Sequence, residues 1–446
     1  MEKLFKLKEN NTTVRTEIIA GLTTFFTMAY IIFVNQTFLG ENTPVGMPNI
    51  AVMTATCLSA AFGTFLIGIL TNYPLAQAPG MGLNAVFCYT MCLAMGLSWQ
   101  SALAAVFIAG IFFIVITVTG ARKAIVDAIP LTLKKAISAG IGLFIALIGF
   151  NNAGLLSSDT GTIIGMGALN VPTTLLALFG LALTIILVVS KVPGALFVSI
   201  IGTSTVGCLI QFVFNVNMGI TKPTSWVPHL DFSTFGACFS GFKTLFATPL
   251  LALVSVMITL VLVDMFDTIG TLIGAANKAG YLDEDGNLPK VEKAMLADSV
   301  ATVAGAVFGT STVTTYVEST AGISAGGKTG LTSMTTSICF LFALLLSPIL
   351  GFVPMAATAP VLIVVGVMMC SALKDIDWDD ITVAIPSFIT VLAMPLFYSI
   401  TDGLAFGFIS YVIVMIATKK VKEIHPLMYV IVLLFVIKYA LPFINF

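Results

Sequence analysis

Three carboxylates lie inside or beside apolar runs, where acidic residues are rare. Asp264 and Asp267 belong to a run that begins near Phe246, and Glu318 lies near the end of a hydroxyl-rich segment further along. A carboxylate at membrane depth costs ~2.5 kcal/mol or more on insertion scales, so such residues mark binding sites or proton relays. These residues therefore predict a site that binds a ligand and takes up a proton.

The spacing of the two aspartates fits one helix. Asp264 and Asp267 are three positions apart and so share roughly one helical face. Gly270 and Gly274 follow, and small residues let another backbone approach closely. The alternative is a span that ends at Val263, which would leave both aspartates at the membrane interface.

Glu318 has no Lys or Arg near it in the sequence. Burial penalises the charged form of a carboxylate, so a buried Glu318 can take a proton from one side of a membrane and release it on the other. A loop in water would give it no such role. Asp267 and Glu318 are the two candidates for proton coupling, and the sequence does not choose between them.

Two segments cannot be regular membrane helices throughout. Residues 310–316 are rich in hydroxyl and β-branched side chains, which suit a strand as well as a helix. Residues 73–82 contain two prolines and two glycines. Extended backbone at membrane depth survives only against protein or a water-filled cavity. We therefore expect the segments to pair, each leaving a helix N-terminus with free N–H groups at the site.

Other side chains fit this site less specifically. Asn84 could donate and accept hydrogen bonds there, or cap its helix. The predicted substrate-binding residues are Asn84, Asp264, Asp267, Thr315, Tyr316 and Glu318. Asp298 fits a site role or an interfacial position equally. The aromatic residues of the first span, including Tyr30, could stack on a flat ligand but more commonly pack.

The composition is that of a polytopic helical membrane protein. Hydrophobic residues make up 58% of the chain and charged residues 9%. The seven cysteines form no CxxC pair and both histidines stand alone, so we expect neither a metal site nor another cofactor. The chain has no Walker A, HExxH or GxSxG motif, and an enzyme is not expected. We see no removable signal peptide.

Hydropathy predicts fourteen spans, since a crossing helix needs ~20 apolar residues. The third and tenth are short and follow the two interrupted segments. The spans are 16–38, 49–71, 80–97, 100–120, 132–152, 171–190, 193–213, 246–268, 292–308, 314–327, 330–350, 357–373, 381–399 and 402–418.

The distribution of Lys and Arg supports this count. With a cytoplasmic N-terminus, only Lys222 and Lys243 fall on the outer side. The others fall inside with the N-terminal cluster: Arg122, Lys123, Lys134, Lys135, Lys191, Lys278, Lys290, Lys293, Lys328, Lys374, Lys419, Lys420 and Lys422. The apolar stretch 426–443, which Lys438 interrupts, lies outside this count; we favour an interfacial position over a weak span.

The two halves of the chain echo each other. The third span of each half is short and interrupted, and GALFVSIIG (194–202) and GLAFGFISY (403–411) open the seventh and fourteenth spans. An odd number of spans per half requires the second half to run inverted relative to the first. Inverted repeats with paired broken segments are typical of secondary transporters with a midplane site.

Four blocks carry a resemblance to a known family, in this order: TTFFTMAY (23–30), QAPGMGLNA (77–85), DMFDTIG (264–270) and GTSTVTTYVESTAGI (309–323). Together they resemble the AzgA-like purine permeases, the adenine/guanine/hypoxanthine branch of the nucleobase–cation symporters. The resemblance implies an all-α, uracil-permease-type fold of fourteen spans as seven-plus-seven inverted repeats, with short strands before spans 3 and 10. It implies core-domain halves at 1–120 and 246–350, and gate-domain halves at 121–245 and 351–446, the last with the C-terminal apolar segment.

The family also implies a function, namely proton-coupled import of hypoxanthine, guanine or adenine across the plasma membrane by alternating access. The partners would be the purine base, a proton and the lipid bilayer, with a possible homodimer and no nucleic acid. Its substrate contacts would fall on Asn84, Asp264, Asp267 and Glu318. A sulfate or bicarbonate carrier of the same architecture is the alternative. An intramembrane aspartyl protease is disfavoured, because its Gly-x-Gly-Asp pattern is absent. The preferred purine and the choice between proton and sodium coupling stay open.

Overall fold

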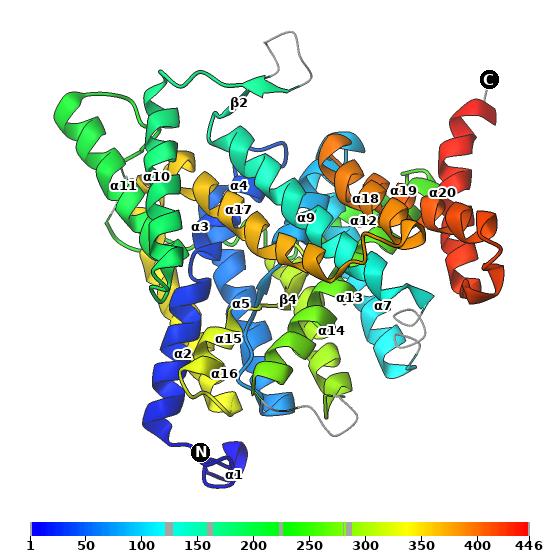
Figure 1. Ribbon diagram of the computed structural model, residues 1–446. Coiled ribbons are helices and arrows are strands. Elements are labelled where there is room, and N and C mark those ends of the chain that lie inside the picture. The colour runs from blue at the N-terminus through cyan, green and yellow to red at the C-terminus, as the bar shows by residue number, and fades with distance from the viewer. Residues whose placement is uncertain are drawn as a thin grey trace.

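A computed structural model describes residues 2–120, 128–157, 164–222, 226–279, 281 and 288–444. Within these ranges the chain folds into a bundle of helices (Figure 1), and ten helices are long and apolar enough to cross a membrane. The cytoplasmic assignment of Arg122 and Lys123 falls on residues outside the described ranges.

The helices account for most of the described chain. Their bounds are α1 (Glu2–Phe5), α2 (Val14–Met28), α3 (Ile31–Val34), α4 (Gln36–Leu39), α5 (Asn49–Thr71), α6 (Met81–Ala85), the π-helix η1 (Val86–Ala94), α7 (Trp99–Val118), α9 (Leu131–Asn152), α10 (Pro172–Val189), α11 (Ala195–Phe214), α12 (Ala237–Leu245), α13 (Leu250–Ala279), α14 (Val291–Phe308), α15 (Ser319–Ser324), α16 (Gly330–Ala343), the 3₁₀ helix η2 (Leu344–Phe352), α17 (Met355–Met369), η3 (Cys370–Asp375), α18 (Ile381–Leu396), α19 (Ile400–Ala417), η4 (Val421–Glu423) and α20 (Pro426–Ile444). The strands are β1 (Gln77–Pro79), β2 (Leu156–Ser157), β3 (Gly165–Met166) and β4 (Val313–Thr315).

Two expectations about the helices were wrong, and one helix is longer than its predicted span. The predicted tenth span, 314–327, begins within β4 and contains only the six-residue helix α15. The predicted eighth span, 246–268, agrees with the apolar part of α13, Leu250–Ile269, and the helix continues beyond it to Ala279. The predicted loop 214–245 contains the additional helix α12, which packs on α7.

The predicted pairing of the two interrupted segments is confirmed. β1 and β4 are antiparallel, with Gln77 opposite Thr315 and Pro79 opposite Val313. β4 lies near the middle of the bundle (Figure 1). Each strand therefore satisfies its backbone groups against the other, as non-helical backbone at membrane depth requires.

The helices pack as two groups. In one, α5 contacts α14 and α16, while α7 contacts α14 and α2 contacts α16. In the other, α9 contacts α17 and α18, and the pairs α10–α11 and α18–α19 pack together. The helix α13 contacts members of both groups, α7 and α14 on one hand and α9 and α19 on the other. The helix that carries the two predicted site aspartates thus lies at the boundary between the groups.

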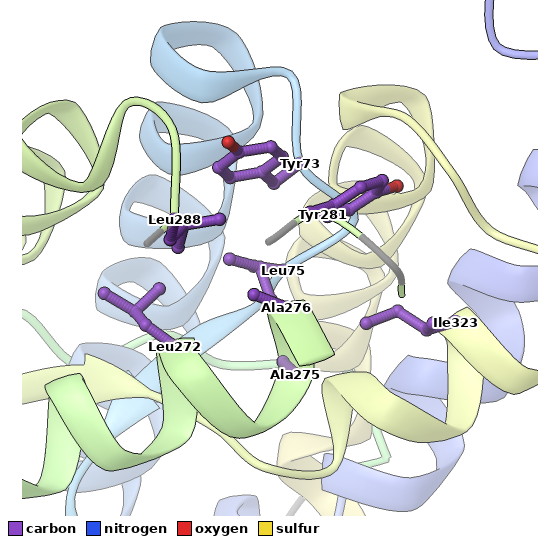
Figure 2. A pocket seen from close by; sticks show the side chains of 8 residues that line it. All are labelled: Tyr73, Leu75, Leu272, Ala275, Ala276, Tyr281, Leu288 and Ile323. Atoms are coloured by element: carbon purple, nitrogen blue, oxygen red, sulfur yellow. The ribbon is translucent and has the colours of Figure 1, made fainter. Parts of the chain in front are cut away.

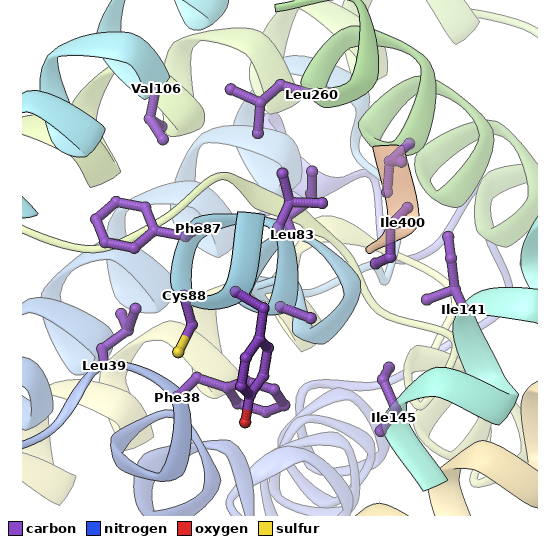
Figure 3. Close-up of a cluster of buried hydrophobic side chains, with 14 of the residues drawn as sticks. Phe38, Leu39, Leu83, Phe87, Cys88, Val106, Ile141, Ile145, Leu260 and Ile400 are labelled. Carbon is purple, nitrogen blue, oxygen red and sulfur yellow. The ribbon is translucent and has the colours of Figure 1, made fainter. Parts of the chain in front are cut away.

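A large apolar core surrounds the helix formed by α6 and η1. Leu83 and Phe87 from this helix belong to one apolar cluster with Ile141 of α9, Leu260 of α13 and Ile400 of α19 (Figure 3), and all but Ile141 are fully buried. Helices of both groups therefore converge on the segment that follows β1.

The C-terminal apolar stretch is helical. α20 packs on α19 and α13, and the Lys438 Nζ atom lies 3.0 Å from Asp402 Oδ1. Lys438, which interrupts the apolar stretch, thus pairs with a carboxylate of α19. The interfacial position of this stretch stays a prediction.

Candidate functional site

The helix α13 carries Asp264 and Asp267 well inside its length, and both lie within its apolar part, Leu250–Ile269; their depth in the membrane stays a prediction. Asp264 is fully buried. Asp267 keeps part of its surface accessible. A three-residue step leaves the two side chains only ~60° apart around the helix, so it is their burial, and not their direction, that separates the two carboxylates.

Asp267 lies against the start of the α6 helix. Its Oδ2 atom is 3.8 Å from the position that a Cβ atom would occupy on Gly80, and that Cβ would be 2.7 Å from Thr314 Cγ2. Gly80 therefore lets the chain that leads into α6 approach both β4 and the Asp267 carboxylate. A larger residue here would collide with the Thr314 side chain of β4.

Glu318 follows β4 directly and precedes α15. Its Oε1 atom accepts a hydrogen bond of 2.6 Å from the Tyr30 hydroxyl. The Glu318 carboxyl group is also close enough to Asp267 for the two charges to interact. Like Asp267, it keeps part of its surface accessible, whereas the preceding residues 310–316 are all buried. The fold thus brings together the two carboxylates that the sequence singled out for proton coupling, and this role stays a prediction.

Asn84 belongs to a buried polar network beside the strands. It does not cap α6, whose N-cap is Gly80 and lacks a side-chain cap, so the capping alternative was wrong. Its Nδ2 atom donates to Asn35 Oδ1 over 2.6 Å, and its Oδ1 atom accepts from Ser311. Asn35 in turn donates to Thr310. Asn84 therefore ties the first span and the 310–312 segment to the start of α6.

Thr315 and Tyr316 are engaged within the strand pair. The Thr315 hydroxyl accepts from Gln77 Nε2 over 3.2 Å, and the Tyr316 hydroxyl donates to the Pro79 carbonyl. Both side chains are buried. They hold β1 against β4, and as substrate contacts they stay predictions.

A further carboxylate, Asp298 of α14, lies behind the strands. It is fully buried within the protein. Its Oδ1 atom accepts from Gln77 Nε2 over 3.3 Å and from Thr268 Oγ1 over 3.0 Å. Thr268 also bonds to Thr314 of β4 over 2.8 Å. This network anchors the strand pair to α13 and α14.

The sequence did not reveal that Tyr30, Asn35 and Gln77 belong to the hydrogen-bond networks of this site. The sequence alone marks Tyr30 as a stacking or packing aromatic and Gln77 as part of the motif QAPGMGLNA. Asn35 carries a clearer signal, since a carboxamide within an apolar first span is costly unless it is paired.

A shallow hollow, too narrow to hold a water molecule, lies between Leu272 and the strand lead-in (Figure 2). Tyr73 and Tyr281 stack across it with ring centroids 5.1 Å apart. Their hydroxyls bond to the carbonyls of Pro289 and Lys328. Apolar side chains and two engaged tyrosines cannot recognise a polar ligand, so this hollow is not the predicted site.

Comparisons with known proteins agree on the class of protein. Residues 15–406 match the permease family. The adenine permease AdeP of Escherichia coli is 40% identical over 98% of this chain and 95% of its own. The guanine/hypoxanthine permease PbuO of Bacillus subtilis is 42% identical over 98% of this chain and 99% of its own.

Solved structures show the same fold at low sequence identity. The transmembrane domain of the cyanobacterial bicarbonate transporter BicA superposes with a TM-score of 0.62 at 16% identity, covering 88% of this chain and 97% of that domain. The protein is therefore a multi-pass membrane transporter and not an enzyme. The chain belongs to the permease family, in the branch that includes the adenine and the guanine/hypoxanthine permeases.

Proposed function

We propose that this protein imports a purine nucleobase together with a proton. The observation that carries the proposal is the placement of Asp267 and Glu318 at the paired strands. Both carboxylates are partly accessible, and they are close enough for their charges to interact. The relatives named as adenine and guanine/hypoxanthine permeases support the choice of substrate.

The chemistry of the site suits a neutral heteroaromatic ring. Purine ring N–H groups are donors, and carboxylates are acceptors. Asp267 and Glu318 would contact the base, while Asp264, Asn84, Thr315 and Tyr316 complete the site around them. Protonation of one carboxylate would relieve its repulsion with the other. The proton would therefore be needed for the loaded carrier to change conformation.

We propose fourteen spans in two inverted seven-span repeats, with the short tenth span formed by β4 and α15. The packing supports this. If each span is replaced by the span seven positions away, the pair α7–α14 becomes the pair α16–α5, and the pair α10–α11 becomes the pair α18–α19. The pair α9–α17 stays the same. All five of these pairs are in contact. The group with α5, α7, α14 and α16 would be the core domain, and the group with α9 and α17 the gate.

Alternating access would then be movement of the core against the gate. The site lies where α13 contacts both groups, so relative movement there would change the access of Asp267 and Glu318. The distribution of Lys and Arg supports a cytoplasmic N-terminus. A plasma-membrane location and a homodimer are part of the same proposal.

Uptake into proteoliposomes tests the proposal. Purified protein should accumulate labelled hypoxanthine, guanine or adenine when the outside is acidic, and a protonophore should stop the accumulation. Accumulation driven by a sodium gradient at equal pH would show that the coupling ion is sodium and not the proton.

The anion alternative is tested in the same assay. Carboxylates in the site repel an anion, so unlabelled purines should compete and sulfate or bicarbonate should not. Absence of purine uptake, or competition by sulfate alone, would contradict the proposed function.

A further inference from the structure

Tyr30 occupies a break in the first span. α2 ends at Met28 and α3 begins at Ile31, and the backbone between them tightens into three-residue turns. The Ile32 N–H donates to the Ala29 carbonyl over 3.2 Å, and the Phe33 N–H donates to the Tyr30 carbonyl over 3.1 Å. Such tightened turns within a helix often mark functional positions. Tyr30 is fully buried, and its hydroxyl reaches Glu318.

The Glu318 side chain does not cap its own helix and can therefore bond to the Tyr30 hydroxyl. It holds the N-cap position of α15 but makes no side-chain cap bond. The ionisable groups that face it are Tyr30 from the first span, Tyr316 from β4 and Asp267 from α13. The Tyr316 hydroxyl is already engaged with Pro79. Within the described residues, Tyr30 is thus the one side-chain donor to the Glu318 carboxyl group.

We propose that Tyr30 is a positioning residue, which orients the Glu318 carboxyl group and sets the pH at which it releases its proton. A hydrogen bond to a carboxylate stabilises the ionised form. Without the hydroxyl, Glu318 would hold its proton more tightly and release it only at higher pH. The relevance for transport rests on the proposed function, whereas the effect on Glu318 itself does not.

Infrared difference titration measures the proton on Glu318 without any substrate. The carboxyl band of interest is the one that Glu318→Gln removes. In Tyr30→Phe its midpoint should move to higher pH by about one to two units, a ten- to hundredfold tighter hold on the proton, because hydrogen bonds to charged groups are worth that much. Incorporation of 3-fluorotyrosine at position 30, a more acidic donor, should move the midpoint to lower pH.

Purine uptake measured against pH provides the second readout. Its midpoint in Tyr30→Phe should move in the same direction as the infrared band. In a Glu318→Gln background, Tyr30→Phe should cause no further change. Tyr411→Phe, a tyrosine of α19 that no hydrogen bond connects to Glu318, is the matched control and should leave both midpoints in place.

The outcomes separate this inference from the proposed function. An unchanged infrared midpoint in Tyr30→Phe, a shift to lower pH, or the absence of any band that depends on Glu318 would overturn the role of Tyr30, even if purine uptake is normal. A shifted band in a protein that takes up no purine would support the role of Tyr30 and refute the proposed function.

Discussion

Two glutamates are associated with the first span, Glu17 in its first turn and Glu318 beside Tyr30 within it, and they are held in different ways. Glu17, in the first turn of α2, is fully buried and accepts four hydrogen bonds across its two oxygens. The donors are Thr12 Oγ1 at 2.8 Å, the backbone N–H groups of Lys328 at 3.0 Å and Thr329 at 3.2 Å, and Thr332 Oγ1 at 2.6 Å. Glu318 is partly accessible and accepts one side-chain bond, from Tyr30.

The difference separates a structural carboxylate from a chemical one. Removing Glu17 would leave backbone donors at the start of α16 without a partner, and unsatisfied buried groups cost ~1–3 kcal/mol each. Glu318 has one neutral donor and an acidic neighbour, so gaining or losing a proton breaks little of the structure. Four predictions test this contrast.

The largest effect is expected for Glu318→Gln. Proton-driven purine uptake should fall at least a hundredfold, because the amide cannot carry the proton, which is a loss of about 2.7 kcal/mol in the coupled step. The melting temperature in detergent should stay within about 2 °C of the wild type, since few contacts are lost. Uptake with unchanged pH dependence would remove Glu318 from the coupling step.

Glu17→Ala should show the opposite pattern. We expect a loss of about 3 kcal/mol or more in stability, measured by thermal or chemical unfolding, because several buried donors lose their acceptor. The matched control is Glu9→Ala, since Glu9 forms an exposed pair with Lys6 at 3.0 Å, and exposed pairs contribute ~0–1 kcal/mol. Equal losses in the two variants would show that the Glu17 bonds do not stabilise the fold.

The two aspartates of α13 should also differ. Asp267→Asn should weaken purine binding about tenfold, because the accessible carboxylate beside Gly80 would lose its charge; a charge-assisted hydrogen bond is roughly twice as strong as a neutral one. Asp264→Asn, at a fully buried position, should act mainly on stability. Binding isotherms of the two variants provide the measurement. Identical losses of affinity would mean that burial does not separate their roles.

The smallest effect is expected for Thr332→Val. This change removes one donor to Glu17 and should cost about 1 kcal/mol, the usual worth of one hydrogen bond. Thr335→Val is the control, because the Thr335 hydroxyl bonds only within its own helix, to the Leu331 carbonyl at 3.0 Å. If both variants unfold at the same temperature, the Thr332–Glu17 bond contributes no measurable stability.

Most of the membrane helices could be predicted from hydropathy alone, and the pairing of the two interrupted segments followed from their prolines, glycines and β-branched residues. The prediction of a continuous helix over 314–327 was wrong, because a strand at this depth is stable only through its partner. That partner, β1, lies more than two hundred residues earlier in the chain. No local average of hydropathy contains such a contact.

In the candidate site, too, some features could be predicted from the sequence and others only from the structure. Asp267 and Glu318 could be identified because an acidic residue in an apolar run is conspicuous in any sequence. Glu17 is equally acidic and adjoins an apolar run, yet only the structure reveals that its oxygens are saturated by donors from α16. The local sequence does not distinguish a saturated carboxylate from an accessible one.

The sequence by itself determined that this is a membrane protein with broken segments, acidic residues at depth and the motifs of the permease family. These properties are sums over neighbouring residues, and burial in lipid depends on such sums. Only the tertiary structure decided that Tyr30 meets Glu318, that Asn84 is tied to Asn35, and that Gly80 lies beside Asp267. Hydrogen bonds depend on direction and on ångström distances between remote segments, which arise only when the chain is packed.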